Sequence, residues 1–288
     1  MNRALMATAV AAGMAGAGCA EIVPQKLGIS LTPQPLTDPV VFNFALNLEY
    51  LEAEYYQRGV NGISVPDEHV GPNPGAVNGG RQVAFQTPYL REFMAEIAND
   101  ELNHVRFLRH AIAGSPLVEM GRPTIDLQGS FQAAGKAAGL GDGFDPFADE
   151  TSFLLGAFLF EDVGVTAYHG AAKLLSGGET LAAAAGILAV EAYHGALIRT
   201  QIAESGDQVI HAANAISAAR DALDGPAQKE QAVTIEDGRY IIAPSDPNGI
   251  AFERTPQQVL NVVYLSADPD VRKGGFFPDG VRGIVHHT

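Results

Sequence analysis

The chain has little cysteine and little positive charge. Cys19 is the only cysteine in 288 residues, which excludes an internal disulfide and a zinc site built from several thiolates. Lysine and arginine number 18 against 33 aspartate and glutamate residues, for a formal net charge of -15. This excess repels nucleic acids and anionic membranes over most approaches, so cations are the expected partners. A solvated, self-repelling surface is the alternative explanation of the same charge.

The first twenty residues lack an apolar run long enough to span a bilayer, and we predict no transmembrane span. They resemble an export signal instead, with a basic start, an Ala-, Gly- and Met-rich stretch, and the small residues Gly18 and Ala20 at a cleavage site. We therefore predict that residues 1–20 are removed and that the protein is periplasmic or secreted. Two alternatives stay open, a lipoprotein anchor at Cys19 and an uncleaved Ala-rich tail.

Four long segments repeat apolar residues at helical spacing, in a chain whose 47% apolar and aromatic content can fill one large core. The sequence predicts an all-α fold with these helices: residues 38–59, 87–113, 149–175 and 179–205. A cap residue before an N1 proline marks two of the helix starts. A Gly-rich surface loop, 60–82, follows the first helix, and a long crossover, 114–147, with a small helix near Phe131 follows the second. Such a crossover lets two helical hairpins pack as a four-helix bundle.

The rest of the chain flanks this bundle, which is predicted over residues 38–205. Residues 21–37 hold three prolines and predict an extended lead-in. Residues 206–288 predict a C-terminal extension packed on the bundle, with helices over 207–223 and 255–264. Between those two helices, Asp-Gly and Asn-Gly turn dipeptides flank an apolar stretch, which indicates either a small strand pair (a β-hairpin) or an irregular wrap.

Acidic residues and histidines recur at matched positions in the four predicted helices. The pattern Glu-x-x-His occurs once in the second helix and once in the fourth, and three residues are nearly one helical turn, so both side chains of a pair share a face. Each of the other two helices carries a glutamate among its apolar positions. The six candidate metal ligands are Glu49, Glu101, His104, Glu161, Glu191 and His194. A single Glu-x-x-His is typical of a solvated pair, but two of them in this order predict a di-metal carboxylate site.

The interior of a bundle requires cations at such a cluster. A carboxylate that is buried, ionised and unpaired destabilises a fold by several kcal/mol. Four inward carboxylates also repel one another, and two divalent cations, each with one imidazole ligand, remove that repulsion. Oxygen and neutral nitrogen ligands suit iron, manganese or zinc, and we expect two ions of iron or manganese. Because carboxylate-rich sites with open positions handle dioxygen or peroxide, small oxidants are the other expected partners.

Neighbouring residues leave part of the ligand assignment open. Glu52 lies three residues after Glu49 and faces the core more squarely on a helical wheel, so it is either the ligand in place of Glu49 or an extra acid beside the metals. Glu54 is expected to point outward into solvent. His110 and His169 lack a partner at ligand spacing and are not expected to bind metal. Three tyrosines are expected either to hydrogen-bond the ligands or trap radicals near the metals, or simply to pack in the core: Tyr56, Tyr168 and Tyr193.

Two motifs carry a resemblance to a known family. Residues 47–49, Asn-Leu-Glu, followed seven residues on by Tyr56, resemble the first ligand helix of ferritins. Residues 100–104, Asp-Glu-x-x-His, resemble the second ligand helix of bacterioferritins. The chain thus resembles the ferritin-like superfamily over residues 38–205, which implies a ferritin-like four-helix bundle and favours the first glutamate of its opening helix as the ligand.

Within that superfamily, the segment 47–56 and the tail 274–278, Gly-Gly-Phe-Phe-Pro, are similar to the desiccation-related proteins of plants, fungi and bacteria. The resemblance implies a stress-linked role in which a metal site disposes of reactive oxygen or holds metal. The long loop, the crossover and the C-terminal extension would disturb the packing of a ferritin shell. A homodimer is compatible with these features, and a ferritin cage is not expected.

Three functional hypotheses share this fold. The first is a di-iron or di-manganese oxidoreductase of the peroxidase, catalase or oxidase kind, with Glu101 and Glu191 bridging or chelating the metals. Its terminal ligands are Glu49, His104, Glu161 and His194. The second is a non-enzymatic protective protein in which the metal only stabilises the bundle. The third is a metal-free helical scaffold that uses the fold for binding.

Overall fold

The computed structural model describes residues 36–113, 115, 120–226, 229–235 and 237–287. The predicted export signal, Cys19 and nearly all of the predicted lead-in lie outside these residues, so export and a lipid anchor stay predictions. Within the described residues four long helices form the bundle: α1 (Asp38–Tyr56), α2 (Pro88–Ala111), α4 (Glu150–Ala172) and α5 (Gly178–Glu204). The all-α prediction and the positions of the four helices are confirmed, with small differences at their ends.

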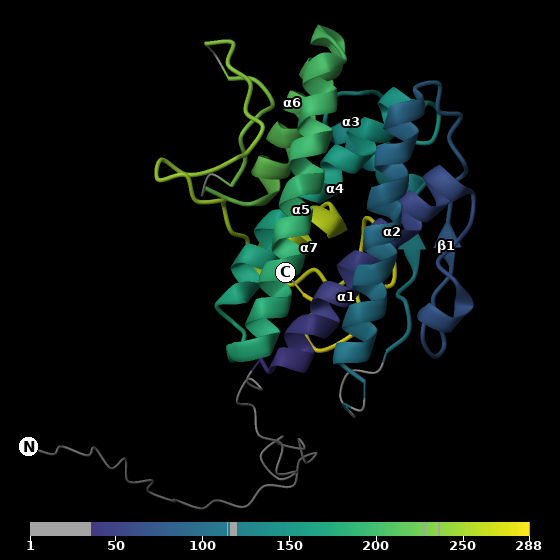
Figure 1. Cartoon of the computed structure of the whole chain (residues 1–288), viewed down its shortest axis with the longest axis vertical. Coiled ribbons are helices and arrows are strands. Elements are labelled where there is room, and N and C mark those ends of the chain that lie inside the picture. Colours follow the sequence, from purple (N-terminus) through teal and green to yellow (C-terminus); the bar gives the residue numbers. More distant parts are fainter. Residues whose placement is uncertain (1–35, 114, 116–119, 227–228, 236, 288) are drawn as a thin grey trace, which may run out of the picture. The chain divides into compact units, whose positions relative to one another are not determined.

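The bundle is built from two helical hairpins. α1 packs along α2, α4 packs along α5, and the four helices run side by side in Figure 1. Local signals set the ends of the helices. Asp149 caps α4, because its side chain accepts the N–H of Ser152 at 2.7 Å. α1 continues as a π-helical turn, η2 (Gln57–Asn61), which stops at Gly62 in the left-handed conformation with φ 69°.

The connection between α1 and α2 folds back onto the crossover. It holds a 3-10 turn, η3 (Asp67–His69), and the short strand β1 (Val77–Asn78), which pairs in parallel with β2 (Ile125–Asp126) of the crossover. The crossover also contains α3 (Gly129–Ala137), the small helix predicted near Phe131. The strand pair was not predicted, because two-residue strands are too short to show an alternating pattern.

The prediction that Glu54 is solvated is wrong. Its carboxylate is fully buried and accepts hydrogen bonds from Arg58 at 2.8 Å, from Ser64 at 2.8 Å and from Arg122. Ser64 belongs to the loop after α1, and Arg122 belongs to the crossover. These segments cover a face of α1 that a bare four-helix bundle would leave in water. Helical spacing alone therefore misplaced this carboxylate.

The C-terminal extension packs two predicted helices onto the bundle. α6 (Asp207–Leu223) contacts α4 and α5, and α7 (Pro256–Tyr264) contacts α4. A capping box of Thr255 and Gln258 starts α7. Between α6 and α7 the described residues form an irregular wrap that holds one short antiparallel pairing. It is an isolated bridge between Thr234 and Tyr240, flanked by backbone hydrogen bonds from Ile235 to Arg239 and from Ile241 to Val233.

A buried ion-pair network ties this extension to α4 and α5. Its members are three arginines and three acids, whose charges cancel: Asp162, Arg199, Arg220, Asp224, Glu230 and Arg254. Arg199 of α5 and Arg220 of α6 both donate to the same oxygen of Asp162, each at 2.8 Å. Burial raises the pKa of Asp162, but the two guanidinium groups outweigh it and lower that pKa below its usual value. Asp162 is therefore ionised, and its two ion pairs hold α5 and α6 against α4.

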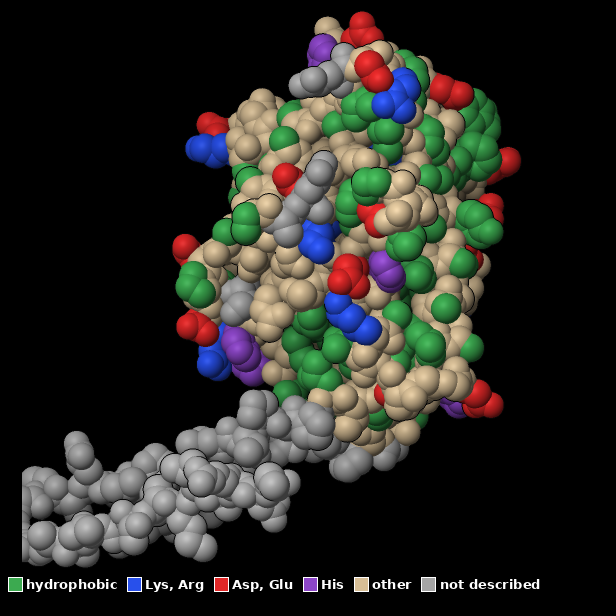
Figure 2. All heavy atoms as spheres, turned by 90° about the vertical axis from the view of Figure 1, so that its left-hand side faces the viewer, with side chains coloured by type: hydrophobic (Ala, Val, Ile, Leu, Met, Phe, Trp, Pro, Cys, Tyr) green, Lys and Arg blue, Asp and Glu red, His purple; other side chains and the backbone are tan. Residues whose placement is uncertain are grey.

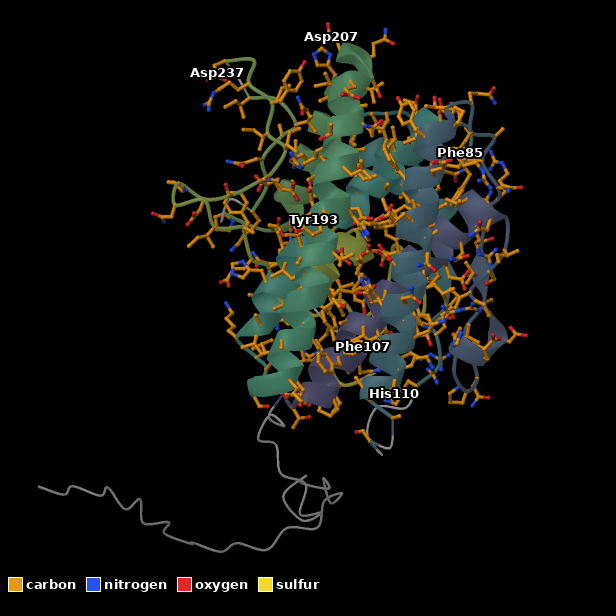
Figure 3. The ribbon with its side chains drawn as sticks, viewed as in Figure 1. Phe85, Phe107, His110, Tyr193, Asp207 and Asp237 are labelled. Atoms are coloured by element: carbon orange, nitrogen blue, oxygen red, sulfur yellow. The ribbon has the colours of Figure 1, made fainter. Side chains whose placement is uncertain are left out.

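The outer side of α5 is exposed and apolar. By length and composition α5 could cross a membrane, with a mean hydropathy of 1.6 over 18 residues of which 33% are buried. This is weak evidence for a span, because the same helix carries Glu191 and His194 on its buried side. Tyr193 is 74% exposed on α5 (Figure 3), so none of the roles predicted for it is found. On the face in Figure 2, acidic, basic and apolar side chains are interspersed.

Candidate metal centre

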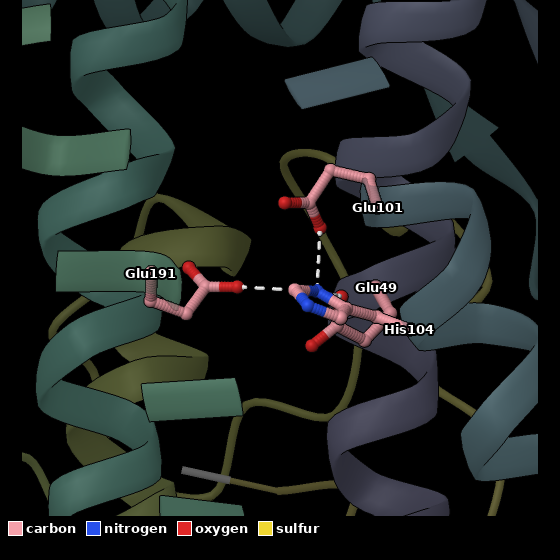
Figure 4. A group of neighbouring side chains, drawn as sticks. All are labelled: Glu49, Glu101, His104 and Glu191. Atoms are coloured by element: carbon pink, nitrogen blue, oxygen red, sulfur yellow. Dashed lines mark hydrogen bonds and ion pairs between the residues drawn. The ribbon is translucent and has the colours of Figure 1, made fainter. Parts of the chain in front are cut away.

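All six predicted ligands lie in the centre of the bundle. Each is buried, with between 0% and 8% of its surface exposed. α1 and α4 contribute one glutamate each, and α2 and α5 contribute one Glu-x-x-His pair each, because residues three apart on a helix share a face. Figure 4 shows Glu49, Glu101 and Glu191 converging on His104. The sequence therefore identified side chains that meet, and their role as metal ligands stays a prediction.

One group of ligand atoms surrounds His104. Its Nδ1 lies 3.2 Å from Glu49 Oε2, 3.4 Å from Glu101 Oε2 and 3.6 Å from Glu191 Oε1. Donors that share one cation at a metal–ligand distance of about 2.1 Å lie about 3 to 4 Å apart. The four side chains therefore have the spacing of a single coordination shell.

A second group surrounds His194. Its Nδ1 lies 3.1 Å from Glu101 Oε1 and 3.4 Å from Glu161 Oε2. The two oxygens of Glu101 thus face different imidazoles, Oε2 toward His104 and Oε1 toward His194. A carboxylate in this position can bridge two cations, one in each group.

Glu52 joins the same cluster, so the two candidate glutamates of α1 are not alternatives. Glu52 is 6% exposed, and one of its carboxylate oxygens lies within 4.8 Å of oxygens of Glu161 and Glu191. Glu49 instead faces the His104 group. Residues three apart on a helix share a face, which is why spacing alone could not choose between them. Five carboxylates and two imidazoles therefore meet in this centre.

Two tyrosines hold ligand carboxylates in place. Tyr56 OH donates to Glu161 Oε1, and Tyr168 OH donates to Glu49 Oε1. Burial raises the pKa of both phenols well above its usual value, and the neighbouring carboxylates raise it further. Both tyrosines therefore keep their protons and act as hydrogen-bond donors to the candidate ligands, which is one of the roles predicted for them.

Asp100 supports the second imidazole, a role that the sequence analysis missed. Its Oδ2 lies 3.3 Å from Nε2 of His194, across from α2 to α5. A carboxylate that accepts the Nε2 proton fixes the tautomer in which Nδ1 is free to bind a cation. The sequence offered one signal for this role, namely that Asp100 directly precedes Glu101. However, adjacent residues on a helix point about 100° apart, so adjacency alone does not predict that both side chains reach the same site.

The carboxylates keep protons on the two imidazoles. Burial lowers the pKa of His104, but Glu49 and Glu101 outweigh it and raise the pKa to about 12. Burial likewise lowers the pKa of His194, and Glu161 and Glu101 raise it to about 12. In chelator-treated protein both imidazoles are therefore protonated at neutral pH, and a cation must displace these protons in order to bind.

Burial also keeps protons on most of the carboxyl groups. It raises the pKa of Glu49 to about 7, against the lowering effect of His104. It raises the pKa of Glu52 and Glu191 well above the usual value, and the charge of Glu101 adds to this. Burial would raise the pKa of Glu101 as well, but the two imidazolium groups lower it instead. The cluster thus neutralises itself with protons where no cation is bound.

Several buried polar atoms of this cluster lack a hydrogen-bond partner among the described residues. They are Glu52 Oε2, Glu101 Oε1, Glu161 Oε2, Glu191 Oε2 and His194 Nδ1, of which the last lies within ion-pair distance of Glu101 Oε1 and Glu161 Oε2. A buried polar atom without any partner costs about 1–3 kcal/mol, so Glu52 Oε2 and Glu191 Oε2 indicate a missing ligand. Carboxylate oxygen and imidazole nitrogen both bind iron and manganese. A pair of divalent cations therefore fits the residues present.

Gly164 of α4 gives the carboxylate of Glu191 its room, and Gly164→Ala is expected to weaken metal binding. A Cβ at residue 164 would stand 2.1 Å from Glu191 Oε2, so the carboxylate must move out of the cluster. We expect a loss of about 10- to 100-fold in Mn²⁺ affinity, the range seen when ligands are misoriented. Isothermal titration calorimetry with Mn²⁺ measures it.

Gly195→Ala is the matched control for this substitution. It lies on α5 beside His194, yet its Cβ would meet Asp162 at 3.6 Å and Glu161 at 3.9 Å, which are ordinary contacts. Its Mn²⁺ affinity should stay near that of the wild type. Equal losses in both variants would contradict a specific role of Gly164, because any added methyl group near the cluster would then have the same effect.

The comparisons with known proteins agree with this geometry. The model of the family "Ferritin-like domain" matches residues 37–204, which are the bundle. The chain is 30% identical to "Desiccation-related protein PCC13-62" of Craterostigma plantagineum, over 81% of this chain and 79% of that protein. It is 28% identical to "Ferritin-like catalase Nec2" of Nesocodon mauritianus, over 85% of this chain and 83% of that protein. No solved structure matches the chain significantly.

Proposed function

The chain belongs to the ferritin-like domain family, and from this premise we propose that it is an exported stress protein that disposes of peroxide at a pair of divalent cations, iron or manganese. One relative is named for desiccation and the other for catalase activity, and both names support this proposal. The observation that carries it is Glu101, whose two oxygens face two different imidazoles in a buried centre.

In this proposal the ligands divide between two positions. Glu49 and His104 would hold one cation, Glu161 and His194 would hold the other, and Glu101 and Glu191 would serve both. When bound, the metal pair supplies a two-electron couple that allows one peroxide to be oxidised to dioxygen while a second is reduced to water.

The chain's own residues then orient the ligands and exclude water. Tyr56 and Tyr168 fix two carboxylates, and Asp100 fixes the imidazole of His194. Asp100 keeps 32% of its side chain exposed, whereas His194 keeps 6%. Asp100 thus connects a buried ligand to the solvent-exposed edge between α2 and α5, and we propose that peroxide enters there.

The test is oxygen evolution from hydrogen peroxide by protein loaded with Mn²⁺ or Fe²⁺. Disproportionation releases one dioxygen for every two peroxides consumed, and chelator-treated protein should release none until metal is restored. An oxygen electrode gives the ratio directly. Metal binding without oxygen release would contradict peroxide disposal.

A second function, stabilisation of the bundle by metal alone, is favoured by the buried oxygens of Glu52 and Glu191 that lack a hydrogen-bond partner among the described residues. Cations that bind the folded chain and not the unfolded one raise its stability, by about 4 kcal/mol at a concentration 1,000 times the dissociation constant. Thermal unfolding with and without Mn²⁺ measures this effect. Stabilisation by metal is expected for both functions, so only oxygen release distinguishes peroxide disposal from stabilisation alone.

Metal affinity is expected to rise steeply with pH. The pKa values of His104 and His194 are raised from 6.5 to about 12, so both hold protons across the neutral range and each proton competes with the cation. The raised pKa of Glu49, about 7, adds a third competing proton below neutrality. If two protons leave on binding, affinity rises about 100-fold per pH unit. Calorimetric titrations with Mn²⁺ between pH 6 and 8, in buffers of different ionisation enthalpy, count the protons released on binding. Binding without proton release would contradict the proposal that Mn²⁺ displaces the protons of His104 and His194.

A further inference from the structure

We infer that Glu52, Glu161 and Glu191 form a third cation position, built from carboxylate oxygens alone, beside the two positions that contain an imidazole. The inference rests on the proposed two-metal site, because Glu161 and Glu191 also serve that pair. Glu52 is the residue that the pair does not require.

The geometry of the three carboxylates supports a shared ligand. They come from three different helices, α1, α4 and α5, and each offers an oxygen within 4.8 Å of the other two. Their exposed fractions are 6% for Glu52, 1% for Glu161 and 1% for Glu191. Oε2 of Glu52 and Oε2 of Glu191 lack a hydrogen-bond partner among the described residues, and Oε2 of Glu161 lies 3.4 Å from Nδ1 of His194. Buried oxygens without a partner need a donor or a cation.

The packing around these carboxylates leaves room for them to converge. Gly164 lacks the Cβ that would stand 2.1 Å from Glu191 Oε2. A small cavity beside it is lined by Glu52 and Gly164 and, from the C-terminal extension, by Val262 and Val263 of α7. The extension therefore forms an apolar wall next to Glu52, which makes its charge costly unless a cation lies close by.

The ligand atoms decide which cation suits this position. Since the third position has oxygen ligands only, it suits a hard ion such as Mn²⁺ or Ca²⁺.

The test is the number of Mn²⁺ ions bound per chain, measured by native mass spectrometry and by calorimetry at saturating Mn²⁺. We expect three ions in the wild type, the third with lower affinity than the first two. Glu52→Gln, which keeps the shape of the side chain and removes its charge, should bind two. Glu96→Gln, an exposed glutamate on α2, is the matched control and should still bind three.

Each outcome bears on one proposal. Two ions in the wild type, or three in Glu52→Gln, would overturn the third position and leave the pair intact. No ions in the wild type would overturn the two-metal site itself. Circular dichroism establishes that each variant is folded, and the wild-type count tests the inference even if Glu52→Gln does not fold.

Discussion

Replacement of both His104 and His194 by alanine is expected to abolish metal binding and, with it, oxygen release from peroxide. Each imidazole is the only nitrogen donor in its group, and its Nδ1 lies within 3.6 Å of the carboxylate oxygens that share the cation. Loss of outer partners of a ligand already costs about 10- to 100-fold in affinity, so loss of the ligand itself should cost more than about 100-fold. Calorimetry with Mn²⁺ and an oxygen electrode measure the two effects.

His110→Ala/His211→Ala is the control for this double variant. Both of these histidines are exposed on helices of the same fold, outside the cluster. The control should keep the metal content and the activity of the wild type. If the cluster variant also kept its metal, with the control unchanged, the two imidazoles would not be ligands and the assignment of both positions would be wrong.

Replacement of Arg254 by methionine is expected to lower the free energy of unfolding by about 3–5 kcal/mol. Arg254 is 1% exposed and donates to Asp224 at 2.6 Å and to Thr166 at 2.7 Å, so it connects the C-terminal extension to α4. Its removal leaves Asp224 buried without this cation, and desolvation of an unpaired charge is the source of the loss. Urea unfolding of chelator-treated protein measures the effect without a contribution from metal.

Arg239→Met provides the comparison for Arg254. Arg239 pairs with Asp237 at 2.6 Å, but 69% and 53% of the two side chains are exposed, and Figure 3 labels Asp237 in the outer loop. Water screens such a pair, so no measurable change in stability is expected. A loss for Arg254→Met as small as that for Arg239→Met would mean that the buried network does not hold the extension on the bundle.

The sequence was sufficient for the parts of the fold that follow from local periodicity. Helices α1, α2, α4, α5, α6 and α7 were predicted because apolar residues repeat at helical spacing between caps and glycines. The β1–β2 pair, in contrast, joins Val77 to Ile125 across 48 residues. Neither two-residue strand has a pattern of its own, so only the folded chain reveals the pairing.

The site was predictable where one helix determines which side chains share a face. That rule placed both Glu-x-x-His pairs and the glutamates of α1 and α4 in the core. It could not show that Glu49 and Glu52 enter the centre together, or that Asp100 reaches His194 on another helix. It also misplaced Glu54, because segments distant in sequence cover that side of α1. Contacts within one helix follow from the spacing of residues along the sequence. Contacts between different helices or loops leave no such pattern.

The central claim is that Glu101 bridges two cations in the middle of the bundle. Anomalous diffraction from crystals of protein purified without chelator, and soaked in Mn²⁺, tests it most directly. We predict strong peaks on both sides of Glu101, one about 2.1 Å from Nδ1 of His104 and one about 2.1 Å from Nδ1 of His194. The absence of peaks among these side chains would contradict the claim.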